Sequence, residues 1–589
     1  MAGAPPISPS SAGATAAGTA ATSGDGSAAA EPATSTAASG SRPRLDALVV
    51  ALARLVARIF FREIEVVGAA RLPPSGPLLV VANHQNGMID PLLIAATLPA
   101  GGRGGAGGRR ASGGRMPRFL ATHLAWRNLA LRPWLQLGGV IPIYRPKDVG
   151  AAADPAQNVA SFARCHEQLA RGGAVALFPE GVSHSEPSLV PLKTGAARIV
   201  LEAARRFPPL SPLVVPIGLT FEARGTFRSR ALLVIGEPID PAPEIALDRR
   251  EADREGAAGG GGTGLSGPAS DAGRGAAAST AAVRALTARI DAGLKAVTLN
   301  YGSWKEARLL GRAAELFSTV DAGTAGAAGA TGATGGAGTG TAADAEAAAD
   351  AVASGPSGAA GAASNLRGLP GETTLAERFS LQRAFIEGYA DLCHRDPERT
   401  AAAAAAVDRY DRMLGAFGLR DDQVGARYPA APAVLWVGRT ALRLLVYLPL
   451  ALVGIVLNWL PYRVVGEIAA RAARTPDVPA SFKVFGGIVL FPLAWLLEAG
   501  LAAWLAGPHA ANRAAAALLT LAAGPLTGWI ALRFDDRRGQ FWREARAYLL
   551  LRTRHAIAAE LQARRAAAAR EVAALAGLYR APGGEGAAG

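Results

Sequence analysis

Length, composition and charge narrow the classes of protein to which this 589-residue chain can belong. Its 71 glycines, 39 prolines and long Ala/Gly tracts imply that roughly two-thirds of the length folds. A net charge of +14 favours anionic partners such as lipid headgroups or phosphorylated substrates. Basic patches interleaved with aromatic residues are not evident, so we expect no nucleic-acid partner. Two cysteines, Cys165 and Cys393, provide no disulfide framework, and seven scattered histidines argue against a metal cluster.

The N-terminal region changes character near residue 44. Residues 1–43 are rich in Ala, Ser, Thr, Gly and Pro and are predicted to be disordered, with an organelle transit peptide as the alternative. Residues 45–61 form an apolar helical pattern that carries Arg54, Arg58 and Arg62 along one face. This pattern fits a helix in a membrane interface, or equally a core-packed helix with a solvated arginine face.

Residues 44–250 alternate between short apolar runs and helical patterns. Strands are predicted at 63–67, 78–82, 118–121, 140–144, 174–178, 213–221 and 231–235, and helices at 92–98, 124–137, 158–169 and 194–204. Strands separated by helices predict an α/β domain with a mostly parallel core sheet.

Two Gly/Ala/Thr-rich linkers, 251–280 and 321–365, divide the next part of the chain. A helical segment is predicted at 281–320 between them, and a helical region at 366–425 after them. The fold class is therefore an α/β domain followed by helices.

Residues 430–532 are strongly hydrophobic and predict membrane segments. The 484–507 and 514–532 stretches can each approach or cross a bilayer core of about 30 Å. Basic residues flank this pair on both sides, which predicts a hairpin with both ends in the cytoplasm. The 444–462 stretch, broken by Pro449, is predicted to be re-entrant or interfacial, and a buried helical bundle is the alternative for all three. Residues 533–589 are predicted to form a basic amphipathic helix, centred on 535–577, and a tail.

The run Leu78 to Ala82 ends in Asn83-His84, and Asp90-Pro91 follows after a short turn. We expect a buried strand, a turn, and a helix with Asp90 as its N-cap. A histidine at a strand end with a carboxylate six residues later can form a general base and the group that orients it. The same spacing also arises by chance, and a capping Asp has a structural role of its own.

Three further blocks share this α/β region. Arg145 follows the strand at 140–144, and Phe178-Pro179-Glu180-Gly181-Val182-Ser183-His184 follows the strand at 174–178. Lys193 precedes a helix, and Pro216 interrupts the strand at 213–221. Arg145 and Lys193 could pair with a phosphate group, since arginine offers a planar fork and lysine a point charge.

The four blocks together resemble the glycerolipid acyltransferase superfamily over residues 60 to about 240. This chain has five residues between His84 and Asp90 where the family has four, and Glu180-Gly181-Val182-Ser183-His184 where the family commonly has Glu-Gly-Thr-Arg-Ser. Both departures resemble the membrane-bound glycerol-3-phosphate/dihydroxyacetone-phosphate acyltransferases of the fungal type and their bacterial relatives.

The resemblance implies roles for these residues. His84 would be the general base, and Asp90 would orient it. Arg145, Glu180, Gly181 and Lys193 would bind the acceptor phosphate, with His184 or Lys193 compensating for the missing arginine. Pro216 would line the acyl-donor pocket. It also implies an integral membrane enzyme of phospholipid biosynthesis with its catalytic domain on the cytoplasmic side. No metal or resident cofactor is expected, because acyl-CoA or acyl carrier protein supplies an activated thioester.

Two other functions stay open at this point. The first is acylation of lysophosphatidate by the same chemistry. The second is a non-catalytic membrane scaffold that holds lipid with basic helices.

Overall fold

The computed structural model describes residues 43–98, 116–127, 132–144, 155–259, 278–331, 374–425, 430–472 and 479–580. A seven-stranded sheet has the order β1-β7-β6-β2-β5-β3-β4. The strands are β1 Phe61–Val67, β2 Leu78–Ala82, β3 Arg118–Thr122, β4 Ile141–Ile143, β5 Ala174–Leu177, β6 Leu213–Phe221 and β7 Ser229–Ile235.

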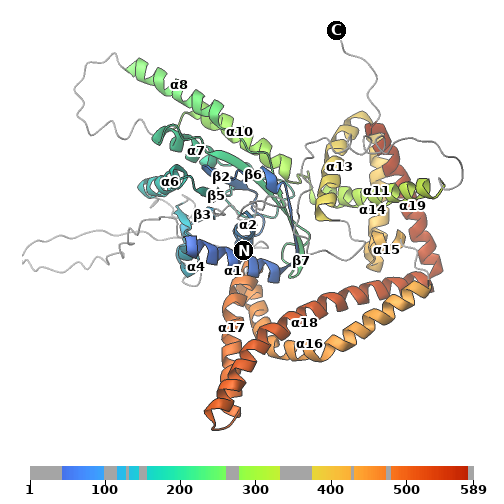
Figure 1. Ribbon diagram of the computed structural model, residues 1–589. Coiled ribbons are helices and arrows are strands. Elements are labelled where there is room, and N and C mark those ends of the chain that lie inside the picture. Colours follow the sequence, from blue (N-terminus) through green and yellow to red (C-terminus); the bar gives the residue numbers. More distant parts are fainter. Residues whose placement is uncertain are drawn as a thin grey trace, which may run out of the picture. The chain divides into compact units, whose positions relative to one another are not determined.

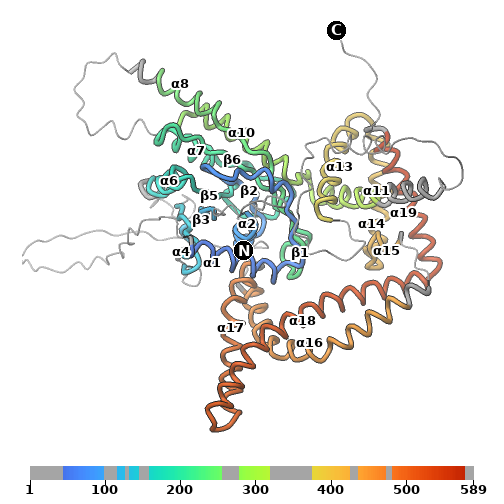
Figure 2. The backbone as a smooth tube through the Cα atoms, in the orientation of Figure 1, coloured from blue at the N-terminus to red at the C-terminus, as the bar shows by residue number. Residues whose placement is uncertain are grey.

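The sheet is mostly parallel, as the sequence predicts. β6 and β7 pair antiparallel, and the other neighbouring strands pair parallel. β1 precedes β2 in the chain but lies at the far edge of the sheet beyond β7 (Figure 2). The central strand β2 therefore has parallel neighbours on both sides, and its carboxyl end opens at the edge where α/β folds place their sites.

Both faces of the sheet are covered, which explains why β2 is apolar at every position. Leu79 and Val81 join the core under α6 Pro155–Ala170, α7 Gly195–Arg206 and α10 Thr280–Val297. Leu78, Val80 and Ala82 join the opposite core, against α1 Pro43–Phe60 and α2 Ile89–Thr97. Alternate side chains of a strand point to opposite faces, so a strand buried on both faces reads as one continuous apolar run. Figure 1 shows the sheet between these two layers.

Four helices differ from the sequence prediction. The pattern at 124–137 gives two short helices, α3 His123–Arg127 and α4 Arg132–Leu137. α8 Ala242–Gly259 and α11 Trp304–Thr331 run into the stretches predicted as linkers. Alanine, glutamate and arginine dominate the start of the first stretch and alanine is frequent at the start of the second, and these are strong helix formers.

The C-terminal helices form a bundle with a core of its own. α11 packs with α13 Leu375–Arg395, α14 Pro397–Phe417, α15 Asp421–Gly425 and α19 His555–Arg580. Fully buried Tyr410 donates its hydroxyl to Asp421 Oδ1 at 2.7 Å, and Arg565 Nε donates to the same oxygen at 2.9 Å. The prediction of one amphipathic helix over 535–577 is wrong, because α18 ends at Thr553 and α19 buries an apolar face in this bundle.

One carboxylate connects this bundle to the edge of the sheet. Glu65 on β1 accepts the N–H groups of Leu375 and Ala376, at 2.7 and 2.9 Å, and pairs with Arg230 on β7 at 2.9 Å. The first N–H groups of a helix have no partner inside the helix, so Glu65 serves as the acceptor at the start of α13.

In the described part of the chain, three helices are long and apolar enough to cross a membrane: Leu435–Arg471 in α16 Ala430–Ala472, Ser481–Leu505 in α17 Pro479–Leu505, and α18 Ala510–Thr553. Asn458 of α16 joins all three, since its Nδ2 donates to Gly524 O at 3.3 Å and its Oδ1 accepts from Trp495 Nε1 at 3.0 Å. Trp436 stacks on Phe541, 6.1 Å between ring centroids, whereas Asn458 contacts Gly524, so α16 runs antiparallel to the middle part of α18. Helix α16 is continuous through Pro449, and the re-entrant placement of 444–462 stays a prediction.

Candidate active site

The site begins at the carboxyl end of β2. Asn83 is buried and exchanges two hydrogen bonds with Leu219 of β6: its Nδ2 donates to Leu219 O at 3.0 Å, and its Oδ1 accepts from Leu219 N at 2.7 Å. The amide therefore continues the strand pairing one residue past β2 and fixes where the chain leaves the sheet. His84 follows at this fixed exit.

His84 and Asp90 meet as the sequence predicts. His84 Nδ1 lies 2.9 Å from Asp90 Oδ2, and the exposed fractions of the two side chains are 18% and 0%. An ionised carboxylate only accepts, so in the neutral imidazole Nδ1 carries the proton and Nε2 the lone pair. Among the described residues no partner occupies Nε2, and this nitrogen is the basic atom of the site.

The prediction that Asp90 is the N-cap of α2 is wrong. The helix begins one residue earlier, at Ile89, with Met88 as N-cap. Asp90 Oδ2 instead accepts the N–H groups of Gln85 and Asn86, each at 2.8 Å, together with His84. The carboxylate thus folds the His84–Asp90 turn around itself, and this use of Oδ2 replaces the capping bond.

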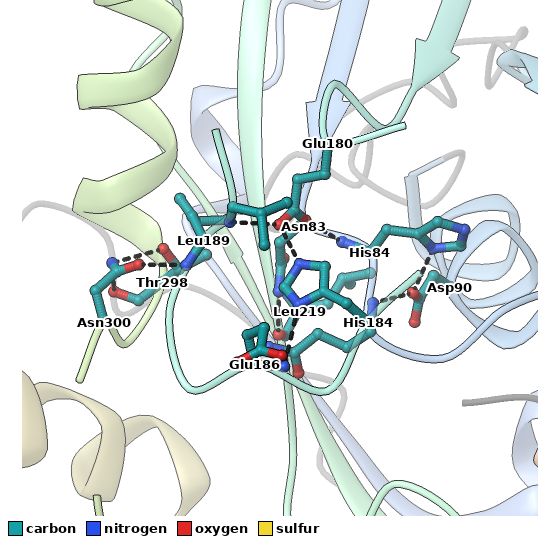
Figure 3. A network of polar contacts seen from close by, with 12 residues as sticks. Asn83, His84, Asp90, Glu180, His184, Glu186, Leu189, Leu219, Thr298 and Asn300 are labelled. Atoms are coloured by element: carbon teal, nitrogen blue, oxygen red, sulfur yellow. Dashed lines mark hydrogen bonds and ion pairs between the residues drawn. The ribbon is translucent and has the colours of Figure 1, made fainter. Parts of the chain in front are cut away.

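Glu180 holds His84 from the other side (Figure 3). Its buried carboxylate accepts the backbone N–H of His84 at Oε1, 2.7 Å away, and the N–H of Val190 at Oε2, 3.1 Å away. Phe178 stacks on the imidazole with 4.1 Å between ring centroids and 14° between the planes. Backbone and ring of the histidine are therefore both fixed.

His184 lies beside Glu180 rather than at an open surface. Its Nδ1 accepts from Glu186 N at 3.2 Å, so its Nε2 carries the proton and donates to Glu180 Oε2. Its backbone N–H donates to His84 O at 3.2 Å. The predicted phosphate-binding roles of Glu180 and His184 stay predictions, and these contacts favour a positioning role for both.

Gly181 and Lys193 lie against each other. Gly181 has φ +71°, and a Cβ built on it would lie 3.0 Å from Lys193 Cδ and 3.1 Å from Nζ. Positive φ and this close approach both favour glycine. The exposed Lys193 thus brings an ammonium group to the turn that holds Glu180. Arg145, the other predicted phosphate ligand, lies outside the described residues.

Comparisons with known proteins identify two domains of the chain. The sequence model of the family described as "Acyltransferase" matches residues 63–220, and the one described as "Glycerol-3-phosphate acyltransferase 2 C-terminal domain" matches residues 369–579. Residues 63–220 thus form a domain of the acyltransferase family.

Curated relatives match this chain over parts of its length. Glycerol-3-phosphate O-acyltransferase 2 of Saccharomyces cerevisiae is 44% identical over 87 residues, 15% of this chain and 12% of that protein. Human 1-acyl-sn-glycerol-3-phosphate acyltransferase alpha is 33% identical over 154 residues, 26% of this chain and 45% of that protein. These matches span less than half the length of either relative.

A solved structure also matches part of the chain. The crystal structure of the 1-acyl-sn-glycerophosphate (LPA) acyltransferase PlsC from Thermotoga maritima is 18% identical, with a TM-score of 0.24, over 33% of this chain and 69% of that one.

Pro216 lies apart from the His84 pair, in the core of the acyltransferase domain. It is buried in β6 opposite Val81, and a Cβ on Gly236 or Gly293 would lie 2.9 or 3.3 Å from its Cγ. Its ring therefore packs against α10, and its predicted role in the donor pocket stays a prediction.

Sequence reasoning missed the contacts that the start of α17 makes with the His84–Asp90 turn and its neighbours. Ser481 Oγ accepts the N–H of Met88 at 3.0 Å, and Lys483 Nζ donates to Gly225 O at 3.1 Å. Asn86 Nδ2 donates to the neighbouring Arg224 O at 2.9 Å. Ser481 lies 393 residues from Met88, and no spacing rule predicts such a contact. Val484, whose apolar character was the available signal, is buried in the same core as α2.

Proposed function

We propose that this chain transfers a fatty acyl group from an acyl thioester to the hydroxyl of a small glycerol phosphate, either glycerol 3-phosphate or dihydroxyacetone phosphate. The observation that carries the proposal is the His84–Asp90 pair, with a proton on Nδ1, a lone pair on Nε2 and a fully buried carboxylate behind it. Such a pair suits deprotonation of an alcohol.

The proposed reaction is a direct transfer. His84 Nε2 takes the proton of the acceptor hydroxyl while its oxygen attacks the thioester carbonyl carbon. A C–O bond forms, the C–S bond breaks, and the leaving thiolate takes up the proton from the imidazolium. Asp90 stabilises that imidazolium through Nδ1–H. Neither cysteine suits a covalent route: Cys165 is fully buried in α6, where desolvation raises its pKa to about 12, and Cys393 lies in α13.

For the acceptor phosphate we propose Lys193 and Arg145 as ligands. Lys193 offers a point charge beside the Gly181 turn, and arginine suits bidentate binding of phosphate. Glu180 would act from behind, by fixing the His84 backbone through Oε1, since a buried carboxylate with both oxygens engaged is poorly suited to meet an anion.

The acceptor identity divides two candidates. The match of residues 369–579 to a glycerol-3-phosphate acyltransferase C-terminal domain favours the small acceptor. The match to 1-acyl-sn-glycerol-3-phosphate acyltransferase alpha supports lysophosphatidate as the second candidate. A non-catalytic lipid-binding scaffold is the remote alternative, and the ordered His84–Asp90 pair argues against it.

We also propose that the catalytic domain faces the cytoplasm. The start of α17 binds the catalytic turn through Ser481, and Asp536 of α18 pairs with Arg228 of the domain at 2.8 Å. Both ends of the α17–α18 hairpin are thus on the side of the catalytic domain, and basic residues concentrate there, as the positive-inside rule requires.

A substrate panel tests the proposal. The full chain, purified in detergent, is assayed for thiol release from acyl-CoA with glycerol 3-phosphate, dihydroxyacetone phosphate or lysophosphatidate. We expect turnover with a small acceptor and its loss by at least about 100-fold in His84→Ala. Turnover confined to lysophosphatidate would shift the proposal to the second candidate, and near wild-type turnover in His84→Ala would refute the base.

A further inference from the structure

A groove between α16 and α18 combines apolar walls with two arginines. Its volume is about 250 Å³, and it is lined by Leu444, Tyr447, Trp529, Ile530, Phe534, Arg533 and Arg537. Tyr447 and Trp529 are 42% and 39% exposed, so the aromatic walls are open to a ligand. We call this the Arg533–Arg537 groove.

The two arginines are available to an anion. Each guanidinium lies over an aromatic ring, Arg533 at 5.0 Å from the Trp529 centroid and Arg537 at 5.7 Å from the Tyr447 centroid. Within the described residues neither forms an ion pair. The acids of the same turn hold other arginines, since Asp535 pairs with Arg538 at 2.6 Å and Asp536 with Arg228 at 2.8 Å. Stacking orients a guanidinium and leaves its N–H donors free for a charged partner.

The position of Arg533 and Arg537 along α18 indicates which kind of anion would reach them. Residues 514–532 of α18 carry no charge, and the arginines follow at 533 and 537, one turn apart. A bilayer core takes about 20 helical residues, so these arginines lie where the helix leaves the core. Tryptophan, tyrosine and arginine are typical of this interface.

We propose that the Arg533–Arg537 groove binds the phosphate headgroup of an anionic phospholipid of the bilayer. The two guanidiniums bind the phosphate oxygens, and the rings of Trp529 and Tyr447 flank the glycerol. The volume of about 250 Å³ holds a headgroup but not two acyl chains. The chains lie along neighbouring exposed apolar residues of α16, which include Leu445 and Val446 at 64% and 65% exposure. The site is separate from His84 and does not depend on the proposed acyl transfer.

Short-chain lipids test this binding without involving the catalytic site. Dioctanoyl phosphatidylglycerol, which is neither an acceptor nor a product of the proposed reaction, is titrated onto the full chain in neutral detergent, and its Kd is measured by thermophoresis. Dioctanoyl phosphatidylcholine and inorganic phosphate form the comparison arms. We expect the double variant Arg533→Gln/Arg537→Gln to raise the Kd for phosphatidylglycerol by at least about tenfold.

A charge-matched control separates the groove from general attraction. Arg543→Gln/Arg552→Gln removes the same charge from exposed positions of the same helix, and we expect a change below about twofold. Arg533→Lys/Arg537→Lys keeps charge and fold but loses the planar fork, so an intermediate Kd is expected. Equal weakening in the groove and control variants would overturn the proposal. Phosphatidylcholine bound as tightly as phosphatidylglycerol, or inorganic phosphate displacing the lipid at comparable concentration, would overturn it as well.

Discussion

Replacing Asp90 by Asn gives the sharpest test of the base–orienter pair. The substitution keeps the size of the side chain and an oxygen that can still accept from Gln85 N and Asn86 N, both now 2.8 Å away. It removes the charge that faces Nδ1 of His84 across 2.9 Å. The turn should therefore persist while the imidazolium loses its counter-ion.

The magnitude follows from this geometry. Two unit charges about 4 Å apart interact by about 4 kcal/mol at the effective dielectric of a protein surface. Asp90 is fully buried but His84 is 18% exposed, so water screens part of the interaction and about 2–4 kcal/mol is expected in the transition state. Each 1.36 kcal/mol is a factor of ten in rate, so kcat should fall by about 30- to 1000-fold.

The assay compares Asp90→Asn with a control that loses the same charge elsewhere. Asp291→Asn removes a carboxylate paired with Lys295 on α10, outside the site, and should leave kcat within about twofold. Thiol release is followed with saturating acceptor, and gel filtration checks that both variants stay folded. A folded Asp90→Asn protein whose kcat falls less than about threefold would show that Asp90 does not stabilise a charged His84.

Three further predictions concern Ser481 of α17, the packing of α16 against α18, and the buried thiol of Cys165. Ser481→Ala removes the oxygen that accepts the Met88 N–H, and it should lower kcat by about 3- to 30-fold while the KM for the acyl acceptor stays unchanged. The control Ser380→Ala removes a hydroxyl that donates within its own helix, and it should change neither constant. A changed KM with constant kcat in Ser481→Ala would contradict the prediction. Gly454→Leu would place a Cβ 2.1 Å from Thr527 O and should lower the thermal unfolding midpoint in detergent by several degrees. A Cβ on Gly438 of the same helix has no neighbour within 4 Å, so Gly438→Leu should leave the midpoint unchanged. Equal midpoints for the two variants would refute the packing of α16 against α18. Burial raises the pKa of Cys165 to about 12, so almost no thiolate forms at pH 8. In a Cys393→Ser variant, maleimide should therefore label Cys165 only when the protein unfolds. Rapid labelling of the native protein would contradict the burial of Cys165.

The sequence predicts the sheet well for a physical reason. Each central strand is buried on both faces, so it appears as an uninterrupted apolar run such as Leu78 to Ala82, bounded by turn residues. Helix ends were less predictable. Asp90 has the residue type and the position expected of an N-cap, but its carboxylate instead accepts three N–H groups of the His84–Asp90 turn.

The candidate site was predictable in part. The pairing of His84 with Asp90 follows from six residues of local chain. The supporting contacts do not, because Glu180, Phe178 and Ser481 lie 94 to 397 positions away from His84 along the chain. They reach the His84–Asp90 turn only through the sheet order and the packing of α17. A residue's type reveals its chemistry, but its partner depends on topology.

The carboxylate of Glu65 has a practical consequence for protein engineering. It fixes the first turn of α13 to β1 and Arg230, so the chain re-enters the fold at residue 374 whatever the length of the stretch before it. The Gly/Ala/Thr-rich composition predicts a linker over 321–365, and the entropy of closing a linker grows slowly, by about 0.6 kcal/mol for each doubling of length. An affinity tag or a fluorescent domain inserted near residue 345 should therefore leave the acyltransferase domain and the bundle intact.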